Sequence, residues 1–258
     1  MTAMQLLFLF LVFFPIATLS TELVLYQQCE KNFTEKYNML QTNINNILLD
    51  MVATSSLNGY AISSYASDSY KPAIYGVTRC QGDVSRQTCS ECITSAAQQI
   101  RSACPNAAQA RGWYEHCYLH YDTENFIGKL DKAVAYLSYS FERSANLTDV
   151  QRAAGELLEE VSEATASGSE KFGYGESYVD ESLTVYGMAQ CTRDLGERAC
   201  SDCLDYAFRY VSFYCGTQTG CRVIGGGCEV RFEIYKFLFL GDSTIGAPAP
   251  APSIVAHN

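Results

Sequence analysis

The residues of this chain best suited to chemistry are its 12 cysteines. Two pairs, Cys89/Cys92 and Cys200/Cys203, have the spacing C-x2-C, which can bind zinc, exchange disulfides or form structural disulfides. Zinc would need a full set of ligands close in space, yet the two pairs lie 111 residues apart. A redox site would need a free thiol of low pKa, and the even cysteine count leaves none over. The pattern therefore favours structural disulfides.

The first 20 residues are typical of a secretory signal peptide. An apolar run from Leu6 to Phe14 is followed by Pro15 and small residues, so we expect cleavage near Ser20. No later stretch reaches roughly 18 consecutive apolar residues, and we expect no membrane span in the mature chain. Secretion places the cysteines in an oxidising compartment, which favours disulfides. Asn32 and Asn146 stand in N-glycosylation sequons, as suits a secreted surface.

The histidines offer little for catalysis. His257 lies in the tail, and His116 adjoins Cys117, which we expect to be oxidised, so a Cys–His nucleophile pair is not available. His116 and His120 are predicted on one face of a strand, exposed to solvent, with no further metal ligands that we can identify. Serine-hydrolase, zinc-protease and phosphate-loop motifs do not occur in the sequence. We expect no catalytic residues, no enzyme activity, no metal and no cofactor.

The net charge of −10 excludes two classes of partner. Nucleic acid and anionic membrane surfaces both need clustered Lys and Arg, which an acidic chain does not supply. The charge predicts a soluble protein whose ligand is neither of these.

A cysteine cassette occurs twice. Cys80, Cys89 and Cys92 have the spacing C-x8-C-x2-C, and the same cassette returns 111 residues later. The offset also relates Cys104 to Cys215 and Cys117 to Cys228, together with non-cysteine neighbours such as Tyr75/Tyr186, Asp83/Asp194 and Arg111/Arg222. The chain is therefore a tandem duplication of a unit of about 110 residues, an ordinary domain size. We call the two copies repeat 1 and repeat 2.

Hydrophobic periodicity predicts the same order of elements in each repeat. In repeat 1 we expect a strand at 23–29, a helix capped by Thr34, strands at 59–66 and 71–80, a helix from Ser85 to Cys104, and closing strands at 112–121 and 134–139. In repeat 2 we expect a strand at 133–141, a helix from Thr148, strands at 172–179 and 182–191, a helix from Leu195 to Cys215, and closing strands at 222–224 and 228–240.

These elements predict an α+β fold in which two helices pack on an antiparallel sheet in each of two disulfide-stapled tandem domains. The expected divisions are a signal peptide at 1–20, the first domain at 21–132, the second domain at 133–240 and a disordered Ala/Pro-rich tail at 241–258. No flexible linker separates the domains, so we expect them to pack together.

The segments YGVTRCQGDVSRQTCSEC and YGMAQCTRDLGERACSDC carry a resemblance to a known family. Over residues 23–240 the chain resembles the plant cysteine-rich repeat secretory proteins, whose domain is of the ginkbilobin type. The resemblance implies these disulfides: Cys29–Cys104, Cys80–Cys89 and Cys92–Cys117 in repeat 1, and Cys191–Cys200 and Cys203–Cys228 in repeat 2.

Repeat 2 departs from the family pattern at its opening cysteine, whose place falls near Ser140. It has an extra Cys221 six residues after Cys215. Without a bond to each other, Cys215 and Cys221 would both lack a partner. We therefore expect a local Cys215–Cys221 disulfide and no free thiol.

The family resemblance also implies a mannose site formed by an Asn, an Arg and a Glu. The corresponding residues are Glu30, Arg111 and Asp122 in repeat 1 and Glu142, Arg222 and Glu233 in repeat 2. Glu replaces the Asn in both repeats, and a carboxylate only accepts hydrogen bonds, whereas an amide also donates them.

An alternative is that each Arg forms a cross-strand ion pair with the acidic residue of its own set, Arg111 with Asp122 and Arg222 with Glu233, and the sequence favours this alternative. Trp113 could stack on a sugar, but core packing over a disulfide is the favoured interpretation.

We therefore expect a secreted, non-enzymatic protein of the plant apoplast, acting in defence or stress response by binding cell-surface or pathogen proteins or glycans. The alternative is a mannose-binding antifungal lectin. The expected partner is an extracellular protein or a glycan, mannose among them, and the sequence does not indicate the oligomeric state.

Overall fold

A computed structural model describes residues 22–33, 38–65, 73–140, 144 and 146–239. Several expectations lie outside this part of the chain: the signal peptide, the cap at Thr34, Glu142, His257 and the Ala/Pro-rich tail.

The two repeats have the same architecture. Repeat 1 contains β1 (Val24–Asn32), α1 (Asn38–Asn58), β2 (Tyr60–Tyr65), β3 (Ile74–Cys80), α2 (Arg86–Ala103), β4 (Ala107–Tyr114) and β5 (Cys117–Asp122). Repeat 2 contains β6 (Val134–Tyr139), α3 (Leu147–Ser167), β7 (Phe172–Tyr178), β8 (Thr184–Cys191), α4 (Glu197–Tyr214), β9 (Cys221–Gly225) and β10 (Cys228–Glu233). Each repeat forms an antiparallel sheet of five strands, in the orders β1-β4-β5-β3-β2 and β6-β9-β10-β8-β7. The predicted α+β fold of two tandem domains is confirmed.

The predicted closing strands were wrong in three respects. Residues 134–139 form β6, which pairs with β9 of repeat 2 and not with the sheet of repeat 1. Residues 112–121 span two strands, because the chain turns back at Glu115 and His116 between β4 and β5. The last strand of repeat 2 ends at Glu233, well before residue 240.

Disulfides hold each helix-on-sheet layer together. Helix α2 begins after Ser85, whose hydroxyl oxygen accepts a hydrogen bond from the Thr88 backbone N–H at 3.0 Å, as an N-cap does. Its buried face carries Cys89 and Cys92, which are bonded to β3 and β5 respectively. The structure contains the following six disulfides, which are the expected pairs: Cys29–Cys104, Cys80–Cys89, Cys92–Cys117, Cys191–Cys200, Cys203–Cys228 and Cys215–Cys221.

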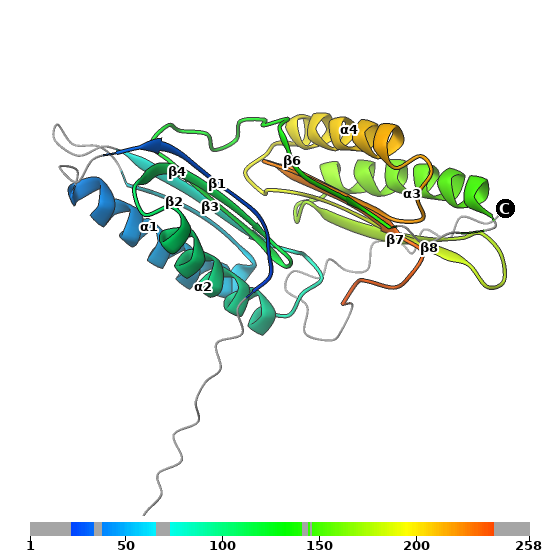
Figure 1. Ribbon diagram of the computed structural model, residues 1–258, viewed down its shortest axis with the longest axis horizontal. Coiled ribbons are helices and arrows are strands. Elements are labelled where there is room, and N and C mark those ends of the chain that lie inside the picture. Colours follow the sequence, from blue (N-terminus) through cyan, green and yellow to red (C-terminus); the bar gives the residue numbers. More distant parts are fainter. Residues whose placement is uncertain (1–21, 34–37, 66–72, 141–143, 145, 240–258) are drawn as a thin grey trace, which may run out of the picture.

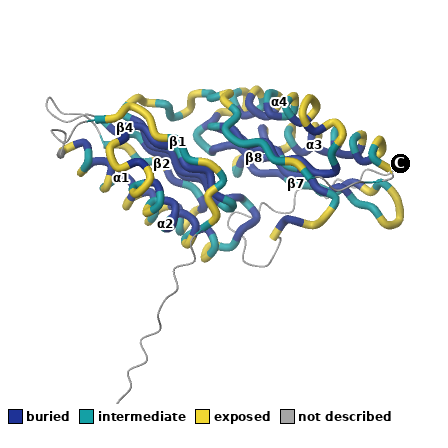
Figure 2. The backbone as a smooth tube through the Cα atoms, viewed as in Figure 1, coloured by how far each residue is buried: buried dark blue, intermediate teal, exposed yellow. Residues whose placement is uncertain are grey.

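The helices of each repeat cover one face of its sheet, and the two sheets lie between the two pairs of helices (Figure 1). The burial pattern agrees, because the strands are largely buried while the outer sides of the helices are exposed (Figure 2). The faces of the two sheets that carry no helices meet at the interface between the repeats.

Trp113 is the apolar centre of this interface. It is buried, as expected, but it packs against Tyr118 of repeat 1 and Ile224 of repeat 2 rather than over a disulfide. Its indole Nε1 donates a hydrogen bond of 2.9 Å to the Gly225 carbonyl of repeat 2. The two repeats are therefore packed together, as we predicted from the absence of a flexible linker between them.

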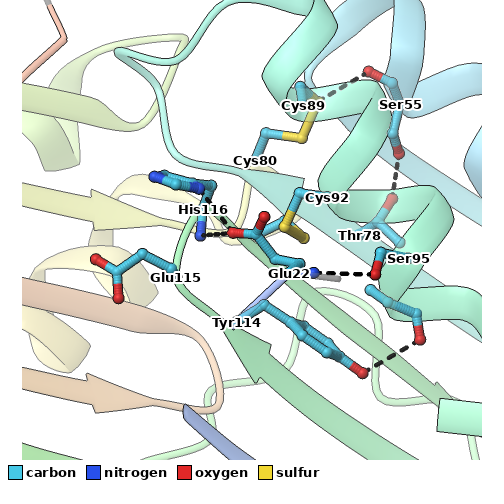
Figure 3. The surroundings of a disulfide bond; sticks show 12 residues. Glu22, Ser55, Thr78, Cys80, Cys89, Cys92, Ser95, Tyr114, Glu115 and His116 are labelled. Atoms are coloured by element: carbon cyan, nitrogen blue, oxygen red, sulfur yellow. Dashed lines mark hydrogen bonds and ion pairs between the residues drawn. A yellow bond between two sulfur atoms is a disulfide. The ribbon is translucent and has the colours of Figure 1, made fainter. Parts of the chain in front are cut away.

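The start of the described chain is fastened beside this interface (Figure 3). The Glu22 backbone N–H donates to the Ser95 hydroxyl at 3.2 Å, and the Glu22 side chain lies 2.6 Å from Nδ1 of His116. The His116 ring also packs edge-on against Phe239, at a centroid distance of 5.6 Å. His116 thus contacts segments near both ends of the described chain.

This contact predicts a pH-dependent stability. The hydrogen bond to Glu22 raises the pKa of His116 above its ordinary value, while partial burial opposes the shift. A raised pKa in the folded state means that the stabilisation is fully present below about pH 6.5 and is lost as the pH rises through the folded-state pKa. We expect Glu22→Gln to lower the free energy of unfolding by up to about 1 kcal/mol near pH 6, because the pair is partly exposed, and by less near pH 8.5.

Urea unfolding of the wild type and Glu22→Gln across this pH range measures the effect. A difference between the two proteins that stays constant or grows with rising pH would show that His116 does not titrate against Glu22.

Candidate functional site

A large cleft of about 760 Å³ lies against the helix-free face of the sheet in repeat 1. Three parts of the chain line it: strands of repeat 1, the connecting segment 123–133, and two loops of repeat 2. The lining residues include Glu30, Lys31, Arg111, Tyr118, His120, Asp122, Phe126, Asp131, Thr192, Asp194, Gly226 and Gly227. We call this space the repeat 1 cleft.

The structure brings together the three residues that the resemblance identified in repeat 1. Glu30 lies on the edge strand β1, Arg111 on β4 and Asp122 at the end of β5, and all three line the cleft. Strand alternation places them there, because Arg111 is paired with His120 across β4 and β5, and Asp122 follows His120 by two residues on the same face. Glu30 is exposed at the mouth of the cleft, whereas Asp122 is buried.

The favoured ion pair between Arg111 and Asp122 is wrong. Arg111 instead contacts the Asp131 carboxylate of the connecting segment at 2.5 Å. Asp122 contacts Lys31 of β1 at 2.9 Å. The register explains the difference, since His120 and not Asp122 stands opposite Arg111, so each charge takes a closer partner. Lys31 has a left-handed backbone, with φ 55°, which is uncommon outside glycine.

The expectation that His116 and His120 share one solvent-exposed strand face was wrong, because His116 lies partly buried in the turn between β4 and β5 and His120 is buried. Phe126 from the connecting segment covers its ring, with centroids 3.7 Å apart. Burial lowers the pKa of His120 well below its ordinary value, and the nearby positive charges of Arg111 and Lys31 lower it further. The imidazole is therefore neutral at physiological pH, with one nitrogen that donates and one that accepts.

Four polar atoms in the wall of the cleft have no hydrogen-bond partner among the residues that the structure describes. They are Arg111 Nε, the Tyr118 hydroxyl, His120 Nε2 and Asp194 Oδ1. An unsatisfied buried polar group costs about 1–3 kcal/mol, so native proteins rarely leave several together without a function. All four atoms are buried within the wall of the cleft.

The charges around the cleft nearly cancel. Four cationic side chains line it, Lys31, Arg111, Lys129 and Lys132. Five carboxylates face them, Glu30, Asp122, Glu124, Asp131 and Asp194. This balance suits a neutral polar ligand better than a strongly charged one, because a charged ligand would meet as many repulsive as attractive groups.

The corresponding surface in repeat 2 is closed. Arg222, the counterpart of Arg111, is buried and contacts Glu229 at 2.7 Å and Glu115 of repeat 1 at 2.9 Å. Glu233 contacts Arg231 at 3.0 Å, so the favoured pairing of Arg222 with Glu233 is also wrong. Of the residues expected to form a second sugar site, Arg222 is held in ion pairs at the interface between the repeats and Glu233 pairs with Arg231 of its own repeat, while Glu142 lies outside the described residues.

Glu229 remains ionised inside this interface. Burial alone would raise its pKa, but Arg222 and Arg79 outweigh burial and hold the pKa below its ordinary value. Arg79 reaches Glu229 across the interface at 3.4 Å. The side chains of Arg79, Arg222 and Glu229 are each only 6% exposed, so their charges depend on one another.

The described residues show neither a metal centre nor a membrane span. They contain no group of three or more His, Cys, Asp and Glu side chains placed to hold a metal ion. Within the same ranges, no helix combines the length and apolar character needed to cross a bilayer. Asn32 and Asn146, the predicted glycosylation sites, are both exposed.

Comparison with known proteins establishes the family. The model for the salt stress response/antifungal domain matches twice, over residues 27–124 and 138–235. The chain belongs to the salt stress response/antifungal family. The expected resemblance to cysteine-rich repeat secretory proteins is thereby confirmed.

Individual relatives agree with this family. Cysteine-rich repeat secretory protein 55 of Arabidopsis thaliana is 32% identical over 87% of both chains. The antimicrobial ginkbilobin-2-like protein of Castanea crenata is 31% identical over 76% of this chain and 81% of its own length. Among solved structures, the tandem DUF26 ectodomain of the Arabidopsis thaliana cysteine-rich receptor-like protein PDLP8 superposes with a TM-score of 0.72. It is 26% identical and covers 83% of this chain and 100% of its own.

Sequence reasoning missed the part of the cleft that lies outside repeat 1. Asp131 stands after the last strand of repeat 1, and at the 111-residue offset it matches Asp242, which lies outside the described residues. Asp194 could have been noticed, since it matches Asp83 at the 111-residue offset. Both carboxylates accept a backbone N–H from a segment outside their own repeat core, Gly128 for Asp194 and Phe239 for Asp83, each at 2.8 Å.

The buried charge network predicts that a single substitution at Glu229 strongly lowers the stability of the fold. We expect Glu229→Gln to lower the free energy of unfolding by about 3–5 kcal/mol, because it leaves Arg222 and Arg79 buried without their shared carboxylate. Denaturant unfolding at neutral pH measures the change. The matched control is Glu156→Gln, which removes an exposed helical contact with Arg152 and should cost no more than about 0.5 kcal/mol. Equal effects of the two variants would contradict the assignment of Glu229 to a buried charge network.

Proposed function

We propose that the protein is a secreted, non-enzymatic binding protein of the plant apoplast that acts in defence or stress response, and that it binds a glycan in the repeat 1 cleft. The observation that carries the proposal is the meeting of Glu30, Arg111 and Asp122 in one cleft whose wall holds unpaired polar atoms. The relatives support the setting, since they include secretory, antimicrobial and receptor-like proteins.

The chemistry of the cleft suits sugar hydroxyls. Each hydroxyl donates one hydrogen bond and accepts others, and the cleft offers donors from Arg111 and Lys31 and acceptors from Glu30 and Asp122. Only one terminal nitrogen of Arg111 contacts Asp131, so other N–H groups of the guanidinium remain for a ligand. Mannose is the sugar that the family resemblance indicates, which makes a mannose-binding antifungal lectin the specific form of the proposal.

Sugar binding has a direct test. We expect isothermal calorimetry of the secreted protein with mannose to show binding, and Arg111→Ala to weaken it at least about tenfold, because several hydrogen bonds from a charged group are lost. Glu30→Asn should strengthen it, since an amide adds the donor that a carboxylate lacks. Arg209→Ala, a change at an exposed position on α4, is the matched control and should bind as the wild type does. If neither the wild type nor Glu30→Asn releases heat with mannose, the lectin form of the proposal fails.

A second candidate function, binding of a protein partner, is favoured by aromatic residues on α4. Tyr206, Tyr210, Phe213 and Tyr214 contact one another in a row. Phe213 is 80% exposed and Tyr214 51% exposed, and exposed aromatic side chains are enriched where proteins meet. Under this proposal Phe213→Ser abolishes capture of an apoplastic partner while mannose binding stays unchanged, and loss of both activities would argue against a separate surface.

A further inference from the structure

The repeat 1 cleft is open because one turn differs between the two repeats. The turn between β4 and β5 of repeat 1 carries Glu115 and His116, and the matching turn of repeat 2, at the 111-residue offset, carries Gly226 and Gly227. Each turn lies against the sheet of the other repeat. Glu115 reaches into repeat 2 and contacts Arg222 at 2.9 Å, which closes that surface. Gly226 has no side chain with which to make the equivalent contact to Arg111.

The space left by Gly226 is only partly filled. The Asp131 carboxylate lies where a side chain on Gly226 would begin, and it contacts Arg111 in place of the missing glutamate. Asp131 comes from the connecting segment and not from a strand, and its side chain is partly exposed. Thr192 and Asp194 of repeat 2 also line this space.

The size of the cleft exceeds what one sugar ring needs. If each non-hydrogen atom of a ligand takes the roughly 30 Å³ of a liquid water molecule, then 760 Å³ holds about 25 such atoms, about twice the number in a hexose. The cleft also has polar groups from both repeats, with Arg111 and Asp122 from repeat 1 and Thr192 and Asp194 from repeat 2.

We propose that the cleft is a composite site formed by both repeats, which binds a neutral oligosaccharide of two or more sugar units. This inference rests on the proposed glycan-binding function and extends it. One sugar unit occupies the part of the cleft near Glu30, Arg111 and Asp122, and the next extends toward Asp194. The site is incomplete without repeat 2, so an isolated repeat 1 surface would hold only the first unit.

Calorimetry with two probes, mannose and linear mannotriose, tests the composite site on the full secreted chain. We expect the wild type to bind mannotriose at least about tenfold more tightly than mannose, because the longer sugar gains contacts with repeat 2. Asp194→Asn should lower the affinity for mannotriose about tenfold and leave the affinity for mannose within about twofold. The asparagine oxygen still accepts the Gly128 N–H, so the connecting segment keeps its anchor.

A second variant closes the cleft by copying the other repeat. Gly226→Glu places a carboxylate where Glu115 stands in the matching turn, so it should displace Asp131, pair with Arg111 and abolish binding of both sugars. Gly155→Glu is the matched control, because a side chain at that helical position meets no neighbour. We expect the control to bind both sugars as the wild type does.

The outcomes separate the two proposals. If the wild type binds neither sugar, glycan binding and the composite site are both overturned. If it binds mannose and mannotriose equally, or if Asp194→Asn weakens both equally, glycan binding stands and the composite site is overturned. Unchanged binding by a folded Gly226→Glu protein would also overturn the composite site.

Discussion

The face-to-face packing of the two sheets is the constraint on which the rest of the structure depends. Each sheet has one face covered by its own helices, and the other face carries charged and aromatic side chains. When these faces meet, buried charges must be paired, because an unpaired charge in the interior is costly. Arg222, Arg79 and Glu229 meet this requirement together, and Trp113 supplies the apolar contact beside them.

This packing forces the two repeats to diverge. A duplicated domain begins with two equal surfaces, and a face-to-face arrangement covers part of both. Tyr118 and His120 of repeat 1 correspond at the 111-residue offset to Glu229 and Arg231 of repeat 2. The neutral pair stays beside an open cleft, whereas the charged pair closes its surface, with Arg231 lying 4.3 Å above the ring of Phe237. The ring of Phe126 covers His120 at the matching position of repeat 1, so the same framework serves both outcomes.

Much of the fold was predictable from the sequence, and the site was predictable only in part. Element order, helix faces and cysteine positions follow from local periodicity and from the duplication, both of which are visible in the chain itself. The partners of Arg111 and the burial of His120 were not predictable. Strand alternation puts Tyr118, His120 and Asp122 on a face of the sheet that would be exposed to solvent in an isolated domain. Contacts from the connecting segment and from repeat 2 bury this face. Such contacts depend on how two finished domains meet, which no local pattern records.

The difference between the open cleft of repeat 1 and the closed surface of repeat 2 also explains why the connecting segment is short and fixed in place. Segment 123–133 is fixed at three points: Phe126 stacks on His120, the Gly128 N–H donates to Asp194, and Asp131 contacts Arg111. Two of these contacts are with repeat 1 and one with repeat 2, so the segment joins the domains and lines the cleft at once. A longer linker would be harder to fix at the same three points, because the conformational entropy lost on ordering a segment grows with its length. The geometry of the cleft is therefore tied to the packing of the repeats, and a ligand that fills it would stabilise that packing by mass action.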